Sequence, residues 1–292
     1  MRQLRNLALV GLATLSATVS PLAAVRAQTT TPASSPHVPL FTRDDAYLGA
    51  FFIAGTIAMF PLDKTVAGAL QRPERQANKL FQTLSRDVRV IAVPGSVIIG
   101  GSLYAIGRLG HVDRMADLGL NGLEALGAGD VVTTAIKWTA GRARPYAVSD
   151  TNPRDFQLLR GLHKGRDDSS FPSGHSLAAF AAAAAVTNET SRWWPGSQWY
   201  IGPAMFGGAA AVAASRLYNN QHWLSDVVLG AGIGTFAGNK IVRYNHRSNP
   251  NNRLNRWLLS ASIVPSGVTG HRLKWSLLPL PRWTGAASSL PW

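Results

Sequence analysis

His222 and Asp226 are the residues whose types and spacing suggest chemistry most directly. They lie four positions apart in the segment SRLYNNQHWLSD, so on a helix they would share one face. A carboxylate that accepts a hydrogen bond from one imidazole nitrogen fixes the tautomer and leaves the other nitrogen free to attack. Asn219 and Asn220 are good capping residues, so we expect His222 in the first turn of a helix, whose N-terminus attracts anions. Taken alone, the pattern also fits an ordinary surface His–Asp pair.

A second segment, FPSGH, combines a helix start with polar groups. Pro172 suits the beginning of a helix, and Ser173, Gly174 and His175 would then present backbone N–H groups and a hydroxyl there. Glycine lets a ligand approach the backbone closely, so the segment predicts a cradle for an oxyanion. His175 could protonate a leaving-group oxygen. A plain turn before an Ala-rich helix is the alternative interpretation.

Cations form the third part of the pattern. The segment KWTAGRARP contains Lys137 and Arg144, which is followed by Pro145, and Arg216 lies just before His222. A phosphoryl group in its pentavalent state spreads negative charge over its equatorial oxygens, which guanidinium forks and an ammonium group match. Cations at helix C-termini could instead balance the helix dipole, and we interpret Arg142, which falls outside the pattern, in this way.

In this order, the three segments resemble the type 2 phosphatidic acid phosphatase (PAP2) superfamily, which also contains bacterial class A acid phosphatases and vanadium-dependent haloperoxidases. Three motifs with compatible spacing are much more specific than one. The resemblance, to an exported bacterial member, covers Lys137 to Asp226, and the C-terminal tail carries no motif of the family. The matching residues are Lys137, Arg144 and Pro145, then Pro172, Ser173, Gly174 and His175, then Ser215, Arg216, His222 and Asp226.

The resemblance implies an all-α fold, a helical bundle with the site at the ends of its core helices. It implies that His222 attacks phosphorus and forms a phosphoenzyme, that Asp226 holds His222, and that His175 protonates the leaving group. It also implies a reaction without metal or cofactor, in a phosphate site that vanadate could occupy. The sequence shows no carboxylate or histidine cluster with metal-ligand spacing. The residues implied to bind the phosphate oxygens are Lys137, Arg144, Ser173, Gly174 and Arg216.

Helical spacing dominates the chain from Asp44 onward, and we expect one helical domain over residues 44–248. β-Branched alternation occurs only near the end, where Trp257–Val264 and Arg272–Leu277 flank Pro265-Ser266-Gly267 and predict a short hairpin in the tail, residues 249–292. The expected helices are Ala46–Phe60, Gln76–Leu84, Val88–Leu109, Arg114–Thr139, Ser173–Thr187, Tyr200–Ser215 and Gln221–Tyr244.

The N-terminus has the pattern of a secretory signal peptide over residues 1–27. Arg2 and Arg5 precede the apolar stretch Leu7–Val19, and Val25-Arg26-Ala27 offers small residues for cleavage. A permanent N-terminal anchor is the alternative. Residues 28–43, rich in Thr, Ser and Pro, are expected to form a flexible linker.

The net charge of +14 implies anionic partners. The basic residues are scattered and no stacking-aromatic motif is present, so we expect no nucleic acid but a phosphorylated lipid, a small phosphate or a membrane surface. Ala46–Leu62 and Val88–Leu109 approach or reach the length of a membrane span. Because Pro and polar residues interrupt several apolar stretches and mean hydropathy is +0.03, we favour a soluble or peripherally bound domain, with an integral membrane domain as the alternative. The chain has no Cys, which excludes disulfides.

These features together predict a metal-independent phosphatase exported to the periplasm or cell envelope. We expect phosphate monoesters or pyrophosphates as substrates, foremost lipid phosphates such as phosphatidic acid or isoprenyl pyrophosphate. The segment Asp150–Ser170 mixes basic and apolar residues beside the site, which fits a lipid phosphate or a plain solvated connection. The alternatives are a vanadate-dependent haloperoxidase and a non-catalytic envelope protein that binds anionic lipid.

Overall fold

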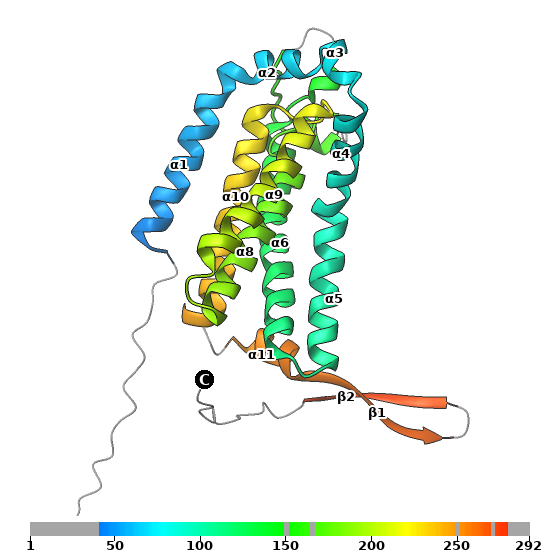
Figure 1. The fold of residues 1–292 in the computed structure, drawn as a ribbon. Helices are drawn as coiled ribbons and strands as arrows, with labels where there is room; N and C mark the ends of the chain where they lie inside the picture. Colours follow the sequence, from blue (N-terminus) through cyan, green and yellow to red (C-terminus); the bar gives the residue numbers. More distant parts are fainter. Residues whose placement is uncertain (1–40, 149–151, 164–166, 249–251, 270–271, 280–292) are drawn as a thin grey trace, which may run out of the picture. The chain divides into compact units, whose positions relative to one another are not determined.

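The structure is a computed structural model that describes residues 41–148, 152–163, 167–248, 252–269 and 272–279. The predicted signal peptide, the linker up to residue 40 and the tail beyond Pro279 lie outside the described residues. Within them the chain is helical up to Ser260 and ends in a two-stranded hairpin, which confirms the predicted fold class (Figure 1). The helices are α1 (Arg43–Met59), α2 (Asp63–Leu70), α3 (Pro73–Gln76), α4 (Lys79–Val90), α5 (Ser96–Leu109), α6 (Asp113–Ala140), α7 (Arg160–His163), α8 (Gly174–Trp193), α9 (Gln198–Tyr218), α10 (Leu224–Arg243) and α11 (Arg253–Ser260).

Helix α1 begins inside the region predicted to be a linker. Thr42 caps it in a capping box, in which the Thr42 backbone N–H donates to the Asp45 carboxylate at 2.7 Å and the Thr42 hydroxyl accepts from the Asp45 N–H. The expected single helix Val88–Leu109 is instead divided. A π-helical turn, Ile91–Gly95, joins α4 to α5 and contains Pro94, which cannot donate a helical hydrogen bond.

Helix α8 lies at the centre of the bundle. It packs against α6, α9 and α10, and Figure 1 shows these helices side by side. Its buried face is made largely of alanine, and Leu177 is its largest fully buried apolar side chain. Small side chains of this kind allow helix backbones to approach closely.

Two glycines let α10 lie directly on the backbone of α8. A Cβ atom on Gly230 would be 2.3 Å from the Ser173 carbonyl oxygen, and one on Gly234 would be 2.3 Å from that of Leu177. Any side chain at either position would therefore push the helices apart. This contact fixes the start of α10 against the start of α8, where the predicted site residues lie.

Two helical stretches, Arg43–Leu70 and Lys79–Leu109, are long and apolar enough to cross a membrane by length and composition. Only 11% and 12% of their most apolar windows are buried in the protein, whereas the core helix of a soluble protein would be mostly buried. Large apolar side chains on them, such as Phe51 and Ile98, are two-thirds exposed. This exposure weighs against the expectation of a soluble domain.

The C-terminal hairpin pairs β1 (Ala261–Thr269) with β2 (Arg272–Pro279) in antiparallel register. The expected first strand began at Trp257, but residues up to Ser260 belong to α11. Pro265-Ser266-Gly267, expected as part of the turn, lies inside β1, where the register shifts as at a β-bulge.

Candidate active site

We call the segment Lys137–Pro145 motif 1 and the segment Pro172–His175 motif 2. Motif 1 begins in the last turn of α6. The Lys137 ammonium donates to the backbone carbonyl of Ser169 at 2.8 Å and to that of Pro172, so it ties α6 to the segment before α8. Gly141 ends α6 in the left-handed conformation (φ 52°), and a Cβ atom there would be 2.2 Å from the Gln157 carbonyl oxygen. The chain therefore turns sharply after α6 and carries the rest of motif 1 toward α10.

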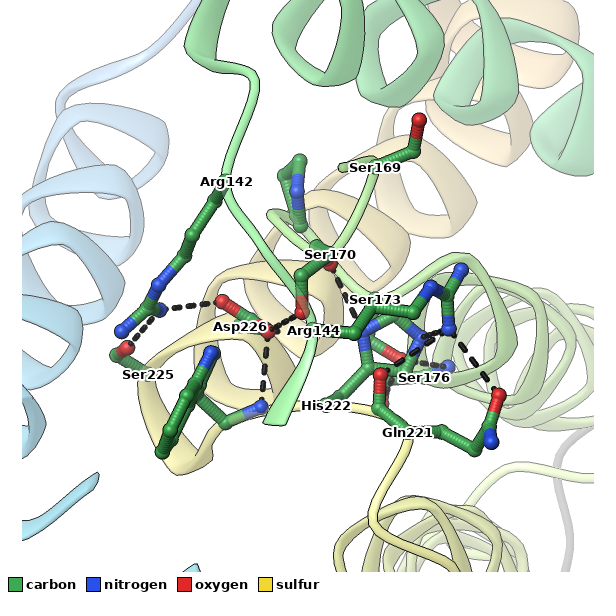
Figure 2. A network of polar contacts seen from close by, with 12 residues as sticks. Arg142, Arg144, Ser169, Ser170, Ser173, Ser176, Gln221, His222, Ser225 and Asp226 are labelled. Atoms are coloured by element: carbon green, nitrogen blue, oxygen red, sulfur yellow. Dashed lines mark hydrogen bonds and ion pairs between the residues drawn. The ribbon is translucent and has the colours of Figure 1, made fainter. Parts of the chain in front are cut away.

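Arg144 is buried and lies over the predicted nucleophile. Its Nη1 donates to the Gln221 backbone carbonyl at 3.0 Å and lies 3.5 Å from His222 Nε2 (Figure 2). Its backbone N–H donates to the Asp167 carbonyl at 2.8 Å. The guanidinium is thus held beside the imidazole nitrogen at which a phosphoryl group would be transferred.

Motif 2 forms the start of α8, with Ser173 as its N-cap. The Ser173 N–H donates to the Asp226 backbone carbonyl at 2.9 Å, and the Ser173 hydroxyl contacts the N–H and hydroxyl of Ser176. The predicted oxyanion cradle therefore has one backbone donor fewer than expected, because the Ser173 N–H already donates to Asp226. The amides of Gly174 and His175 are the first two of α8, which have no acceptor within the helix, and a Cβ on Gly174 would meet open space.

His222 lies before α10 rather than in its first turn, which corrects the predicted position. The N-cap of α10 is Trp223, while Asn220 adopts a left-handed conformation (φ 55°) after the end of α9. His222 Nδ1 is 2.8 Å from the Ser170 carbonyl oxygen and 3.5 Å from Asp226 Oδ2. Because a carbonyl can only accept, Nδ1 carries the proton and the lone pair is on Nε2.

Asp226 is fully buried and its carboxylate is surrounded by donors. Oδ2 accepts from the Trp223 N–H at 2.8 Å and from the Ser170 hydroxyl, and Oδ1 accepts from Arg142 (Figure 2). The sequence analysis missed Ser170, which precedes motif 2. It also misjudged Arg142, which binds Asp226 instead of acting as an exposed helix-end cation.

Arg216 lies in the last turn of α9 and is buried. Its charge, together with those of Arg144, Arg89 and Lys137, acts on His175 in the first turn of α8. The structure therefore gathers the three predicted cations around one point and adds Arg89 of α4, which no motif contains.

The basic groups of the site, His222, His175 and Lys137, have lowered pKa values, and all lie at or beside helix ends outside the stretches Arg43–Leu70 and Lys79–Leu109. Burial lowers the pKa of His222 to about 3, despite the hydrogen bond with Asp226 that favours its charged form. Burial and the neighbouring cations, Arg216 first, lower the pKa of His175 to about 4. Burial and the Arg144 charge lower the pKa of Lys137 to about 7. His222 is therefore neutral at neutral pH and its Nε2 can act as a nucleophile.

At Asp226, in contrast to the histidines, neighbouring charges and hydrogen bonds favour the charged form more strongly than burial disfavours it. Burial raises the pKa of the Asp226 carboxyl, but the Arg142 charge and the hydrogen bonds from His222 and Ser170 outweigh it and hold the pKa near 2. The carboxylate thus stays ionised beside the histidine. A site of this kind, with a neutral nucleophilic imidazole, an anionic partner and several cations, suits an anionic electrophile such as a phosphoryl group.

The segment between motifs 1 and 2 is largely held by its own ion pairs. Arg160 contacts Asp155 and Asp168, each at 2.9 Å, and Phe156 packs against Phe60 and Phe171. Leu158 is nevertheless largely exposed. Within the described residues, no group of three or more His, Cys, Asp or Glu side chains is arranged to hold a metal ion.

Three comparisons place these features among known proteins. The model of the PAP2 superfamily matches residues 119–250, which include all three motifs. A lipid A 1-phosphatase of Porphyromonas gingivalis is 39% identical over 87 residues, which are 30% of this chain and 19% of the relative. The chain thus matches about a fifth of the length of this curated relative.

A solved structure shares the fold. It is the transmembrane PAP2-type phosphatidylglycerolphosphate phosphatase of Bacillus subtilis, with a TM-score of 0.50 and 20% identity. The match covers 70% of this chain and 98% of that one. The likeness to the PAP2 superfamily thus rests on residues 119–250, which contain all three motifs.

Proposed function

We propose that the chain is a metal-independent phosphatase that removes phosphate from a lipid phosphate through a phosphohistidine at His222. The observation that carries this proposal is the fixed tautomer of His222. Its Nδ1 is engaged by the Ser170 carbonyl and faces Asp226, while Nε2 lies 3.5 Å from the Arg144 guanidinium. The nucleophilic nitrogen therefore adjoins the group that would hold the phosphate.

In the first step, the Nε2 lone pair attacks phosphorus and the bond from phosphorus to the ester oxygen breaks. The leaving oxygen takes the proton of the His175 imidazolium. Binding of an anionic phosphate beside His175 would raise its pKa from this low value, so the acid forms when substrate binds. The phosphorylated His222 ring carries positive charge, which the Asp226 carboxylate stabilises.

In the second step, a water molecule attacks the phosphorus of the phosphohistidine. Neutral His175 accepts the proton of that water, the bond between phosphorus and Nε2 breaks, and inorganic phosphate leaves. Lys137, Arg144, Arg216 and the Gly174 amide would stabilise the equatorial oxygens in both steps. The cations supply the charge that a metal ion supplies in other phosphatases.

The preference for a lipid rests on an apolar cavity beside the site. A cavity of about 340 Å³ lies between α4, α5, α6, α8 and α9. Ala179, one turn along α8 from His175, lines it, as does Val88, which adjoins Arg89. An acyl or isoprenyl chain could occupy this cavity with its phosphate at His222. The names of the two relatives also refer to lipid phosphates.

We further propose that the apolar faces of α1, α4 and α5 lie in lipid. Trp199 is 80% exposed at the start of α9, and Trp194 and Tyr200 beside it are more than half exposed. Exposed aromatic residues at the end of a bundle suit the interface between membrane and water. Together with the signal peptide predicted at residues 1–27, this supports an enzyme of the cell envelope whose site opens to the periplasmic side.

The first test is phosphate release by the full chain in detergent with EDTA. The substrates are p-nitrophenyl phosphate, phosphatidic acid and an isoprenyl pyrophosphate, and the variants are His222→Ala and the matched control His163→Ala, which changes an exposed histidine of α7. We expect His222→Ala to lose about 10⁴-fold in kcat and His163→Ala to retain activity. An acid-labile phosphoryl label on the wild type but not on His222→Ala would identify the intermediate. Bromide oxidation after addition of vanadate, or lipid binding without turnover, would overturn the proposal.

The second test concerns the lipid chain. Gly208 lines the cavity and Gly207 does not, and a Cβ atom meets open space at both positions. We expect Gly208→Leu to raise KM or lower kcat for phosphatidic acid about tenfold while p-nitrophenyl phosphate is hydrolysed normally. Gly207→Leu should change neither activity. Equal effects of Gly208→Leu on both substrates would contradict a lipid-chain site.

A further inference from the structure

Arg142 is the largest fully buried charged side chain in the described part of the chain. Its side chain has no exposed surface, and its Cζ lies 4.8 Å from the Phe156 ring centroid and 5.1 Å from that of Phe60. The rings exclude water from the guanidinium and stabilise its charge. A buried cation in such a place needs carboxylate partners.

Those partners are two carboxylates from distant parts of the chain. Arg142 Nη1 donates to Asp226 Oδ1, and Nη2 donates to Asp63 Oδ2 at 2.7 Å. Neither carboxylate has exposed surface. Nε completes the set by donating to the Pro153 carbonyl at 3.0 Å. We call Asp63, Arg142 and Asp226 the buried triad.

Asp63 also holds the first turn of α10 from outside that helix. Its Oδ1 accepts from the Ser225 N–H at 2.8 Å, and its Oδ2 accepts from the Ser225 hydroxyl at 2.6 Å. The Ser225 hydroxyl in turn accepts from Arg142 at 2.7 Å (Figure 2). Asp63 thus satisfies one of the amides that α10 cannot satisfy itself. Both ends of the triad therefore hold the turn that contains Asp226.

We infer that Asp63 and Arg142 are positioning residues that hold Asp226 ionised and in place, so that its carboxylate stabilises the charge that the His222 ring gains on phosphorylation. Asp63 lies in α2, outside residues 119–250 that match the superfamily, so nothing in the motifs assigns it to the site. The inference rests on the proposed phosphohistidine function. A carboxylate that lost Arg142 would be buried without its strongest counter-ion and would take up a proton more readily. It could then no longer balance the positive charge of the phosphorylated His222 ring.

A triad that only joined α2 to α10 would show the same contacts. The test must therefore measure a quantity that depends on the charge of Asp226, namely the dependence of kcat on pH. The charged and titratable groups that face Asp226 are Arg142 after α6, Lys137 in α6 and His222 before α10, with Asp63 of α2 behind Arg142. Arg160 provides the matched control. It is also nearly buried and bound by two carboxylates, but these belong to Asp155 and Asp168 and not to Asp226.

The experiment measures kcat and KM against pH for the wild type, Arg142→Gln, Asp63→Asn and Arg160→Gln, with thermal unfolding of each. We expect Arg142→Gln to lower kcat about 100-fold with KM changed less than about threefold, and to move the acid limb of kcat up by about one pH unit. Asp63→Asn should lower kcat about tenfold without that upward shift, because Arg142 keeps its charge. Arg160→Gln should leave the kcat profile unchanged.

Two results would overturn the inference. One is an acid limb that stays in place in Arg142→Gln, with kcat no lower than in Arg160→Gln. The other is a wild-type kcat in Asp63→Asn. This second result decides the question if Arg142→Gln does not fold. An inactive wild type, or an active His222→Ala, would instead refute the proposed function, so the two failures can be told apart.

Discussion

The two ends of the α8–α10 pair each carry a histidine beside a buried carboxylate, yet only one end is suited to phosphoryl transfer. At the start of α10, His222 faces Asp226. After its end, His246 Nε2 lies 2.7 Å from Glu189 Oε1 of α8. Because α10 has 20 residues, the two pairs are about 30 Å apart. A His–carboxylate pair therefore does not by itself identify a nucleophile.

The difference lies in what surrounds each pair. His222 lies at helix N-termini, which attract anions, and its Nε2 is directed at Arg144. His246 lies at helix C-termini, which favour cations, and its Nε2 is itself the atom bound to Glu189. The same helix pair thus has an imidazole nitrogen beside a cation at one end and a histidine hydrogen-bonded to a carboxylate at the other.

The comparison is tested most strongly by replacing one arginine at each end of the α8–α10 pair, where we expect the largest difference in activity. We expect Arg216→Gln to lower kcat/KM about 10²- to 10³-fold, because Arg216 is the cation with the strongest effect on His175 and would bind an equatorial oxygen. Arg192→Gln, which removes the partner of Glu189 at the other end, should leave kcat/KM within about threefold. Steady-state kinetics with p-nitrophenyl phosphate would measure both, and equal losses would mean that the two ends are coupled.

A smaller effect concerns pH. Because the pKa of Lys137 is lowered to about 7, the ammonium is charged below that pH and loses its charge above it. KM should therefore rise by up to about tenfold as pH increases from 6 to 9, relative to a variant that stays charged. Lys137→Arg is that variant, since a guanidinium keeps its charge throughout.

Lys240→Arg is the matched control for this experiment. Lys240 is a buried lysine toward the other end of α10, paired with Asp45. The substitution Lys240→Arg should leave the dependence of KM on pH as it is in the wild type. A wild-type profile in Lys137→Arg would contradict a role for Lys137 in phosphate binding.

Most of the fold could be predicted from the sequence because helical spacing and glycine breaks are local signals. The end of α6 at Gly141 and the start of α8 after Ser173 followed from residue type alone. Exposure of the apolar helices could not be predicted from mean hydropathy. That average combines the apolar faces of α1 and α5 with the polar ends that carry the site.

The motifs predicted which side chains gather but not how they are connected. The Ser170 carbonyl that binds His222 is a backbone group and leaves no mark in a sequence pattern. Asp63 and Ser225 are 162 positions apart, so only the packed structure brings them together. Arg142 resembled an exposed helix-end cation because burial depends on tertiary contacts.

The smallest expected effect on activity comes from the pair of His246 and Glu189. The Glu189 carboxylate is fully buried and binds Arg192 at 3.0 Å as well as His246 and Asn121. Glu189→Gln removes its charge and should lower the free energy of unfolding by about 2 to 3 kcal/mol. Since Ser173 still donates to the Asp226 carbonyl at the other end, kcat should stay within about twofold of wild type.

Thermal unfolding in detergent and kinetics well below the unfolding temperature would separate these two quantities. His246→Ala should show the same pattern with a smaller loss of stability, because the carboxylate keeps Arg192 and Asn121 as partners. A fall in kcat without a fall in unfolding temperature would mean that the far end contributes to catalysis.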